Sequence, residues 1–178
     1  QEYTIHIEKP IYPDPNKSRG QYLELLELRK KEMPEDWYGL IYLAQEYCYR
    51  GFYQKAIDEF NFILKHYKDH YSTLEQACCY LFMGDSYNHL KDYDNALIAY
   101  LQAINIEPTY REPYLNLAKN YIEIHDYEMA MSFVKLGLKK SWRHYTWLER
   151  DSSWTWEPWD LLCLSAFYSG DKKDSITY

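Results

Sequence analysis

The chain has 178 residues, enough to bury the core of one domain or one compact array. Its six glycines are few and its 21 tyrosines are many, a composition typical of packed helices rather than of a β-sandwich or a disordered chain. The net charge of −7, with Lys and Arg dispersed along the sequence, argues against nucleic acid and anionic membrane surfaces as partners. The longest apolar run (77–83) is too short for a bilayer, so we expect no membrane insertion.

The first segment, YTIHIEKPIYPDPNKSR (3–19), begins with the alternation of a half-buried strand. Tyr3, Ile5 and Ile7 would share one face, and three prolines follow. No other part of the sequence has a strand pattern, and a lone strand leaves its backbone N–H and C=O groups unpaired. We therefore predict that 1–19 is an extended strand remnant and Pro-rich linker from an upstream domain.

Three later stretches are versions of one another: GFYQKAIDEF (51–60), KDYDNALIAY (91–100) and HDYEMAMSFV (125–134). They bring Ala56, Ala96 and Ala130 into register. The last two of these alanines are 34 residues apart and the first two are 40 apart, which is the same period with a six-residue insertion. A period of 34 residues is that of tetratricopeptide repeats, in which each repeat is a pair of antiparallel helices.

Apolar residues around this register follow the spacing of one helix face. The preceding helix of each repeat has an apolar face of its own. Agreement in two helices of three repeats makes the chain resemble a tetratricopeptide-repeat protein. We predict an all-α solenoid of antiparallel helix pairs that winds into a right-handed superhelix. Its array would occupy 20–178, with a half repeat at 20–36, full repeats at 37–70, 77–110 and 111–144, and a partial repeat at 156–178.

The inner surface of such a solenoid comes mainly from the first helix of each pair, so polar residues there are candidate ligand contacts. The groove would receive an extended peptide or a partner helix, or it is a solvated wall, or another part of the parent protein fills it. Ile41, Gln45 and Phe82 stand where chaperone-type repeat domains carry a cationic carboxylate clamp, so we expect no such clamp. The candidate groove residues are Tyr38, Gln45, Tyr49, Asp85, Asn88, His89, Glu112, Lys119 and Glu123.

Five of the six tryptophans lie between 142 and 159, interleaved with charged residues. Indole rings beside carboxylates suit sugar stacking, and they suit equally the covering of an exposed solenoid end or docking on a neighbour. We favour the packing role, because the cluster coincides with an insertion near the last repeat. Trp147, Trp154 and Trp156 are the candidate sugar-binding or docking residues.

No pattern in the sequence predicts a metal, a cofactor or a catalytic site. His66 and His70 have helical spacing but no evident third ligand, so two solvated histidines are the better interpretation. Gly-rich phosphate loops, GxSxG and HExxH are absent from the sequence. Four cysteines without a paired framework indicate free thiols in a reducing, cytoplasmic setting.

Beyond the repeats, the order of segments is similar to the C-terminal region of bacterial family 2 glycosyltransferases. The matching residues are Lys17-Ser18-Arg19, the run YLELLE (22–27), the repeat array and the stretch WEPWDLLCLSAFYSGD (156–171). The resemblance implies a parent that transfers a sugar from a nucleotide donor, with its donor site and metal motif upstream of this chain. The chain would then be an accessory scaffold that contacts its own catalytic domain, a second copy or a peptide. The alternative is a stand-alone adaptor that binds a peptide or helix in its groove.

Overall fold

The computed structural model describes residues 21–144 and 149–170. The predicted strand remnant at 1–19 and Trp147 lie outside the described residues. The part of the chain that is described contains no strand and folds into eight α-helices and two short 3₁₀ helices: α2 (Tyr22–Glu32), α3 (Trp37–Tyr49), α4 (Tyr53–His66), η1 (Lys68–His70), α5 (Thr73–His89), α6 (Tyr93–Ile106), α7 (Glu112–Glu123), α8 (Tyr127–Leu138), η2 (Asp151–Trp154) and α9 (Glu157–Ser169).

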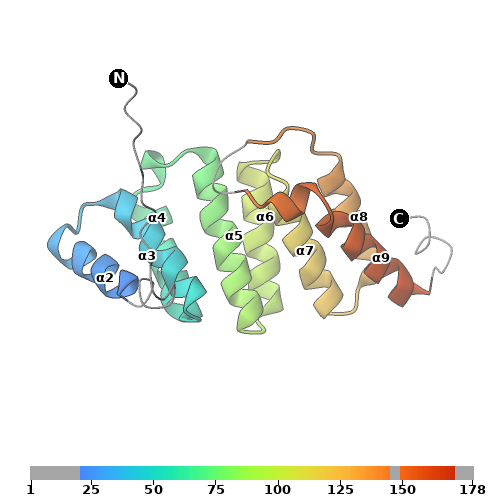
Figure 1. Ribbon diagram of the computed structural model, residues 1–178, viewed down its shortest axis with the longest axis horizontal. Coiled ribbons are helices and arrows are strands. Elements are labelled where there is room, and N and C mark those ends of the chain that lie inside the picture. Colours follow the sequence, from blue (N-terminus) through green and yellow to red (C-terminus); the bar gives the residue numbers. More distant parts are fainter. Residues whose placement is uncertain (1–20, 145–148, 171–178) are drawn as a thin grey trace, which may run out of the picture.

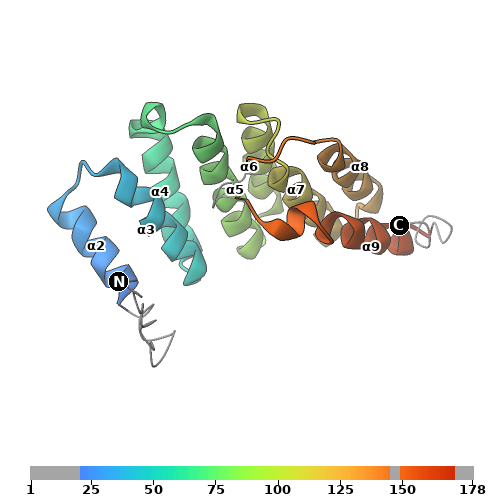
Figure 2. The same cartoon turned by 45° about the horizontal axis from the view of Figure 1, so that its top comes forward.

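The helices stand side by side in a row that runs from α2 at one end to α9 at the other (Figures 1 and 2). Each helix packs against the next one in sequence from α2 to α7, and α8 packs against both α7 and α9. In addition α3 contacts α5, α5 contacts α7 and α7 contacts α9, so these four helices form one layer. The all-α fold predicted from the sequence is confirmed. Helix α5 begins at Thr73, ahead of the expected repeat 77–110.

The turn inside each helix pair has a residue in the left-handed region at the same register position. These residues are Gly51 (φ 77°), Lys91 (φ 64°), His125 (φ 64°) and Gly170 (φ 85°). The left-handed region favours glycine, and polar residues are tolerated there better than β-branched ones. The fourth position, Gly170, supports the interpretation of α9 as the first helix of a further pair.

Aspartate and serine side chains begin most of the helices that follow a turn. Asp92 and Asp126 each accept a hydrogen bond from the backbone N–H three residues on, and Ser72 forms a reciprocal capping box with Glu75. Such caps satisfy backbone N–H groups that have no partner inside the helix, and losing one costs about 1 kcal/mol. The helix starts are therefore encoded locally.

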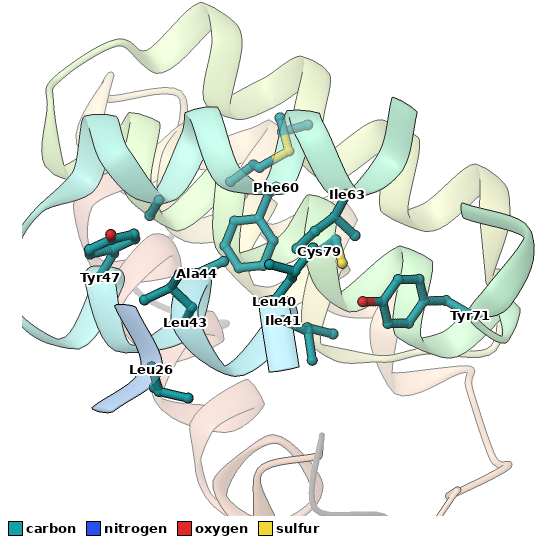
Figure 3. Packing of buried hydrophobic residues seen from close by; sticks show 13 residues of the cluster. Leu26, Leu40, Ile41, Leu43, Ala44, Tyr47, Phe60, Ile63, Tyr71 and Cys79 are labelled. Atoms are coloured by element: carbon teal, nitrogen blue, oxygen red, sulfur yellow. The ribbon is translucent and has the colours of Figure 1, made fainter. Parts of the chain in front are cut away.

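The core is a chain of apolar clusters between successive helices. The three register alanines, Ala56, Ala96 and Ala130, are each 0% exposed, as their place in the repeat predicts. In the first cluster Leu40 and Phe60 meet between α3 and α4, with Leu26 of α2 at its edge (Figure 3). Small residues in register with large ones let the helices approach closely.

The second repeat uses a smaller residue and a larger ring than its neighbours. Gly84 occupies the position of Ala44 and Ala118, and Tyr100 the position of Phe60. A Cβ added at Gly84 would lie 2.6 Å from Cδ1 of Tyr100. The ring cannot easily retreat, because Tyr100 is 1% exposed and its hydroxyl is hydrogen-bonded to Asp85.

We predict that Gly84→Ala destabilises the fold even though alanine is the better helix former. Crowding costs about 1–3 kcal/mol, and we expect the upper part of this range because the Tyr100 ring is held in place, whereas the gain in helix propensity returns only about 1 kcal/mol. The free energy of unfolding in urea should fall, with a smaller fall for Gly137→Ala, whose added Cβ meets its nearest neighbour at 3.2 Å. A Gly84→Ala protein as stable as wild type would contradict this packing argument.

Candidate functional site

A polar cavity of about 430 Å³ opens between α5, α6 and α7. Five residues that the sequence predicted as groove contacts line it: Asp85, Asn88, His89, Lys119 and Glu123. A smaller cavity of about 130 Å³ adjoins it towards α3 and shares Asp85 and His89 with it. The remaining walls of the larger cavity are Lys91, Tyr100, Asn116 and Arg150, and those of the smaller one are Cys48, Tyr49, Tyr53, Phe82 and Ser86.

The carboxylate of Asp85 joins three helices at the floor of the larger cavity. Its Oδ1 accepts a hydrogen bond from the hydroxyl of Tyr100 on α6 (2.8 Å) and another from Nδ2 of Asn116 on α7 (2.6 Å). Burial raises the pKa of Asp85, although these hydrogen bonds and the charges of Arg150 and Lys119 oppose the rise. The group is held by neutral donors within a partly dehydrated site.

The network continues from Asn116 to the segment that precedes α9. Nη2 of Arg150 donates to Oδ1 of Asn116 (2.7 Å) and lies 3.8 Å from Oε1 of Glu157. Glu157 also forms an ion pair with Lys119. Burial acts to raise the pKa of Glu157, but the hydrogen bond from Lys119 and the charge of Arg150 hold it below its usual range. A continuous set of polar contacts therefore links α5, α6, α7 and α9.

Two predicted groove residues are buried rather than open to a ligand. Gln45 is 5% exposed, and its Nε2 has no partner among the described residues. Glu112 is 0% exposed: its Oε1 accepts the backbone N–H of Arg150 (2.8 Å) and burial raises its pKa. The expectation that these positions are free of packing was wrong at Glu112 because residues of the insertion cover it.

The two tyrosines predicted on α3 are exposed, and only one of them lines a cavity. Tyr49 is 62% exposed, meets the ring of Phe82 edge to face at 6.1 Å, and lines the smaller cavity. Tyr38 is 46% exposed and accepts a hydrogen bond from the hydroxyl of Tyr42 (3.2 Å). His89 stacks on Tyr53 with the ring centroids 4.5 Å apart, which makes the smaller cavity an aromatic one.

The predicted tryptophan surface divides into different environments. The guanidinium of Arg111 lies 3.7 Å from the ring centroid of Trp154, and that of Arg143 lies 5.7 Å from it. A cation covers the ring, so Trp154 packs against the protein. Trp156 is 63% exposed and makes no such contact among the described residues.

The structure also places the residues that the sequence weighed for metals and thiols. His70 packs against Trp37 and His66 against Phe62. Within 21–144 and 149–170, no three His, Cys, Asp or Glu side chains are grouped as metal ligands. Cys78 and Cys79 are fully buried, and burial raises the pKa of both thiols. No helix of the described chain is long and apolar enough to cross a bilayer.

Sequence reasoning missed four wall residues of the larger cavity. Tyr100 lies on the apolar face around the repeat register and its ring is buried there, but its hydroxyl reaches the floor of the cavity. Lys91 lies in a turn, and Asn116 is not among the groove residues that the sequence predicts on the first helix of its pair. Arg150 belongs to the insertion, whose path no repeat pattern specifies. Asn116 could have been predicted, because it is polar and lies one helical turn before Lys119, on the same helix face.

Comparison with known proteins gives the class of the fold. The family model described as "Tetratricopeptide repeat" matches residues 79–110. A stretch of 66 residues is 30% identical to tetratricopeptide repeat protein 21B of Homo sapiens, covering 37% of this chain and only 5% of that protein. A crystal structure of MamA aligns with a TM-score of 0.71 at 15% identity, over 99% of this chain and 92% of MamA. A thermophilic TPR protein of Thermus thermophilus aligns with a TM-score of 0.65 at 17% identity, over 91% and 80% of the two chains.

The fold is therefore that of a helical-repeat solenoid. More specifically, residues 79–110 match one tetratricopeptide repeat, and the structural similarity along the array shows that the described helices have the fold of a tetratricopeptide-repeat solenoid. The curated relative is far longer than the matched segment, so its activity and partners are not transferred to this chain. No comparison links the chain to glycosyltransferases.

We predict that Asp85→Asn changes how stability depends on pH. The folded pKa of Asp85 is raised above the ordinary value of 3.8, so the folded state binds more protons than the unfolded state just above that pH. This group therefore lowers stability as pH rises from 3.8 through its folded pKa.

The asparagine variant lacks this contribution, so the wild type should lose stability relative to it over that range. Urea unfolding of both proteins from about pH 3.5 to about pH 7 measures the difference, in which the contributions of Glu112 and Glu157 largely cancel. A difference that stays constant with pH would show that Asp85 does not titrate as its burial implies.

Proposed function

We propose that the chain is a non-catalytic scaffold that binds a segment of a partner protein across α3, α5 and α7. The observation that carries this proposal is the convergence of five polar first-helix residues on one cavity, next to an aromatic one. The two cavities share Asp85 and His89, so together they form one surface that extends from α3 to α7. Such a surface suits several consecutive residues of an extended chain rather than one small molecule. Repeat arrays present extended surfaces of this kind.

The two cavities offer different chemistry to such a segment. The smaller one is walled by Tyr49, Tyr53, Phe82 and the His89 ring, which bury large apolar area at low entropic cost. The larger one offers amide and charged groups that fix orientation. An apolar side chain next to a polar one is the ligand pattern that this surface favours.

The resemblance to family 2 glycosyltransferases bears on which protein carries the scaffold. We propose a bacterial, cytoplasmic parent in which this domain contacts the catalytic domain or a second copy. The YLELLE run that supports this proposal forms α2, and the described cysteines are all free thiols, which suits a reducing compartment. The stand-alone adaptor accounts equally well for the fold. An upstream α/β domain with an Asp-x-Asp motif would support the glycosyltransferase parent, and an initiator Met within a few residues of Gln1 would refute it.

We predict that acidic substitutions in the aromatic cavity weaken partner binding. Peptides selected from a random dodecapeptide phage library on the immobilised protein should bind Tyr49→Glu/His89→Glu at least about tenfold more weakly, since both rings would be replaced by charge. The matched control is Ile98→Glu/Leu101→Glu, two exposed apolar residues of α6 outside both cavities.

Fluorescence anisotropy with the labelled peptides measures the affinities, and circular dichroism checks that both variants are folded. Selected peptides that bind both double variants as well as wild type would overturn the proposed site. A failure to select any binding peptide would overturn the proposed function itself.

A further inference from the structure

Residues 149–157, which we call the strap, lie across the α7 end of the surface formed by α3, α5 and α7. The strap contains η2 and leads into α9, and both views show it crossing the helices in front of α7 (Figures 1 and 2). It belongs to the insertion between the third repeat and α9. Its contacts with α7 resemble those of a bound peptide more than those of an ordinary loop.

Side chains at the start of α7 hold the backbone of the strap. Glu112 accepts the backbone N–H of Arg150 (2.8 Å), and Nη1 of Arg111 donates to the carbonyl oxygen of Ser153 (3.2 Å). Nη2 of Arg111 donates to the carbonyl oxygen of Lys140 (2.5 Å), which anchors the insertion where it leaves α8. Charge-assisted hydrogen bonds to backbone groups are the means by which grooves hold extended chains.

Three side chains of the strap are also held in place. Trp154 lies under the guanidinium of Arg111 at 3.7 Å, with Ser153 beside it fully buried. Arg150 donates to Asn116 (2.7 Å). At the far end Glu157 receives hydrogen bonds from Ser152 (2.8 Å) and Ser153 (3.2 Å), and pairs with Lys119. Both ends of the strap and its centre are thus fixed to α7.

Three of the residues that hold the strap have no charged or amide counterpart in the other repeats. Repeat register places Arg111, Glu112 and Asn116 of α7 at the positions of Ala77, Cys78 and Phe82 on α5, and of Trp37, Tyr38 and Tyr42 on α3. None of those six residues is charged or carries an amide side chain. The start of α7 is therefore polar where the starts of α3 and α5 are not, whereas Lys119 aligns with Gln45 and Asp85, which are polar as well.

We propose that the α7 face is a peptide-binding site that the chain occupies with its own residues 149–157, so that the strap competes with partner segments of the same chemistry. This inference rests on the proposed function and assigns part of the groove to an internal ligand. It also defines the partner that fits: an extended segment with a basic residue four positions before a tryptophan, followed three positions later by a carboxylate.

The strap has a large advantage over a free ligand because it is tethered. A short tether gives an effective concentration in the millimolar range, so an external segment of equal intrinsic affinity gains little occupancy. While the strap is bound, the two cavities remain open, and Arg150 forms a wall of the larger one. Release of the strap would extend the groove along α7.

A peptide with the sequence of residues 149–157, ERDSSWTWE, tests the proposal in the whole chain. The strap variant Arg150→Ala/Trp154→Ala weakens the internal ligand and leaves α7 intact. We expect the fluorescein-labelled peptide to bind this variant at least about tenfold more tightly than it binds wild type, since the tethered competitor is weakened. Fluorescence anisotropy measures both affinities.

Arg111→Gln in the strap-variant background is the matched control, because it removes the guanidinium that stacks on the tryptophan. It should weaken peptide binding about tenfold, and a scrambled peptide should not bind. If the double strap variant is unfolded by circular dichroism, Trp154→Phe replaces it, with a smaller expected gain.

Equal binding of the peptide to wild type and to a folded strap variant would overturn the inference, as would binding that Arg111→Gln leaves unchanged. Either result would leave the proposed function standing, provided that selected phage peptides still depend on Tyr49 and His89. Loss of that dependence would instead refute the proposed function.

Discussion

A single partly buried carboxylate connects the parts of this protein that matter for binding. Asp85 receives hydrogen bonds from Tyr100 on α6 and Asn116 on α7, so three helices from two repeats converge on one oxygen atom. Without these donors, a carboxylate in this position would incur a large dehydration cost. The same contacts orient Asn116, which in turn holds Arg150. The floor of the larger cavity depends on this interaction, and through Asn116 it is connected to one of the contacts that hold the strap.

The fold could be predicted because its determinants are local and recur. Ala56, Ala96 and Ala130 mark the close-packed face of each second helix, and period and register follow from them. The pocket could be predicted in part, because register also states which first-helix residues share a face. The repeat register could not reveal what covers that face. Glu112 is hidden by the strap, and the position of the strap depends on contacts between residues distant in sequence and on an irregular backbone path.

The insertion changes the character of the array at α7. An ideal repeat protein presents similar surfaces at each step, and its stability is close to a sum of repeats and interfaces. Here Arg111 and Glu112 at the start of α7 are nearly inaccessible to solvent and take partners from outside the repeats. Burial lowers the pKa of Arg111 and raises that of Glu112, and hydrogen bonds to the strap and to Lys140 offset part of the cost of dehydrating these side chains.

The two ends of the groove consequently differ in chemistry. At α3 and α5 it is aromatic, with Tyr49, Phe82 and the stacked pair of His89 and Tyr53, whereas towards α7 it is amide-lined and charged. A segment that fills both cavities has to place its apolar side chain in the aromatic cavity and its polar groups beside Arg150. The opposite placement would bury unpaired polar groups among the aromatic rings. Complementarity of this kind governs specificity more than affinity. Because the strap contributes Arg150 to the larger cavity, it helps to determine which segments are complementary to the groove.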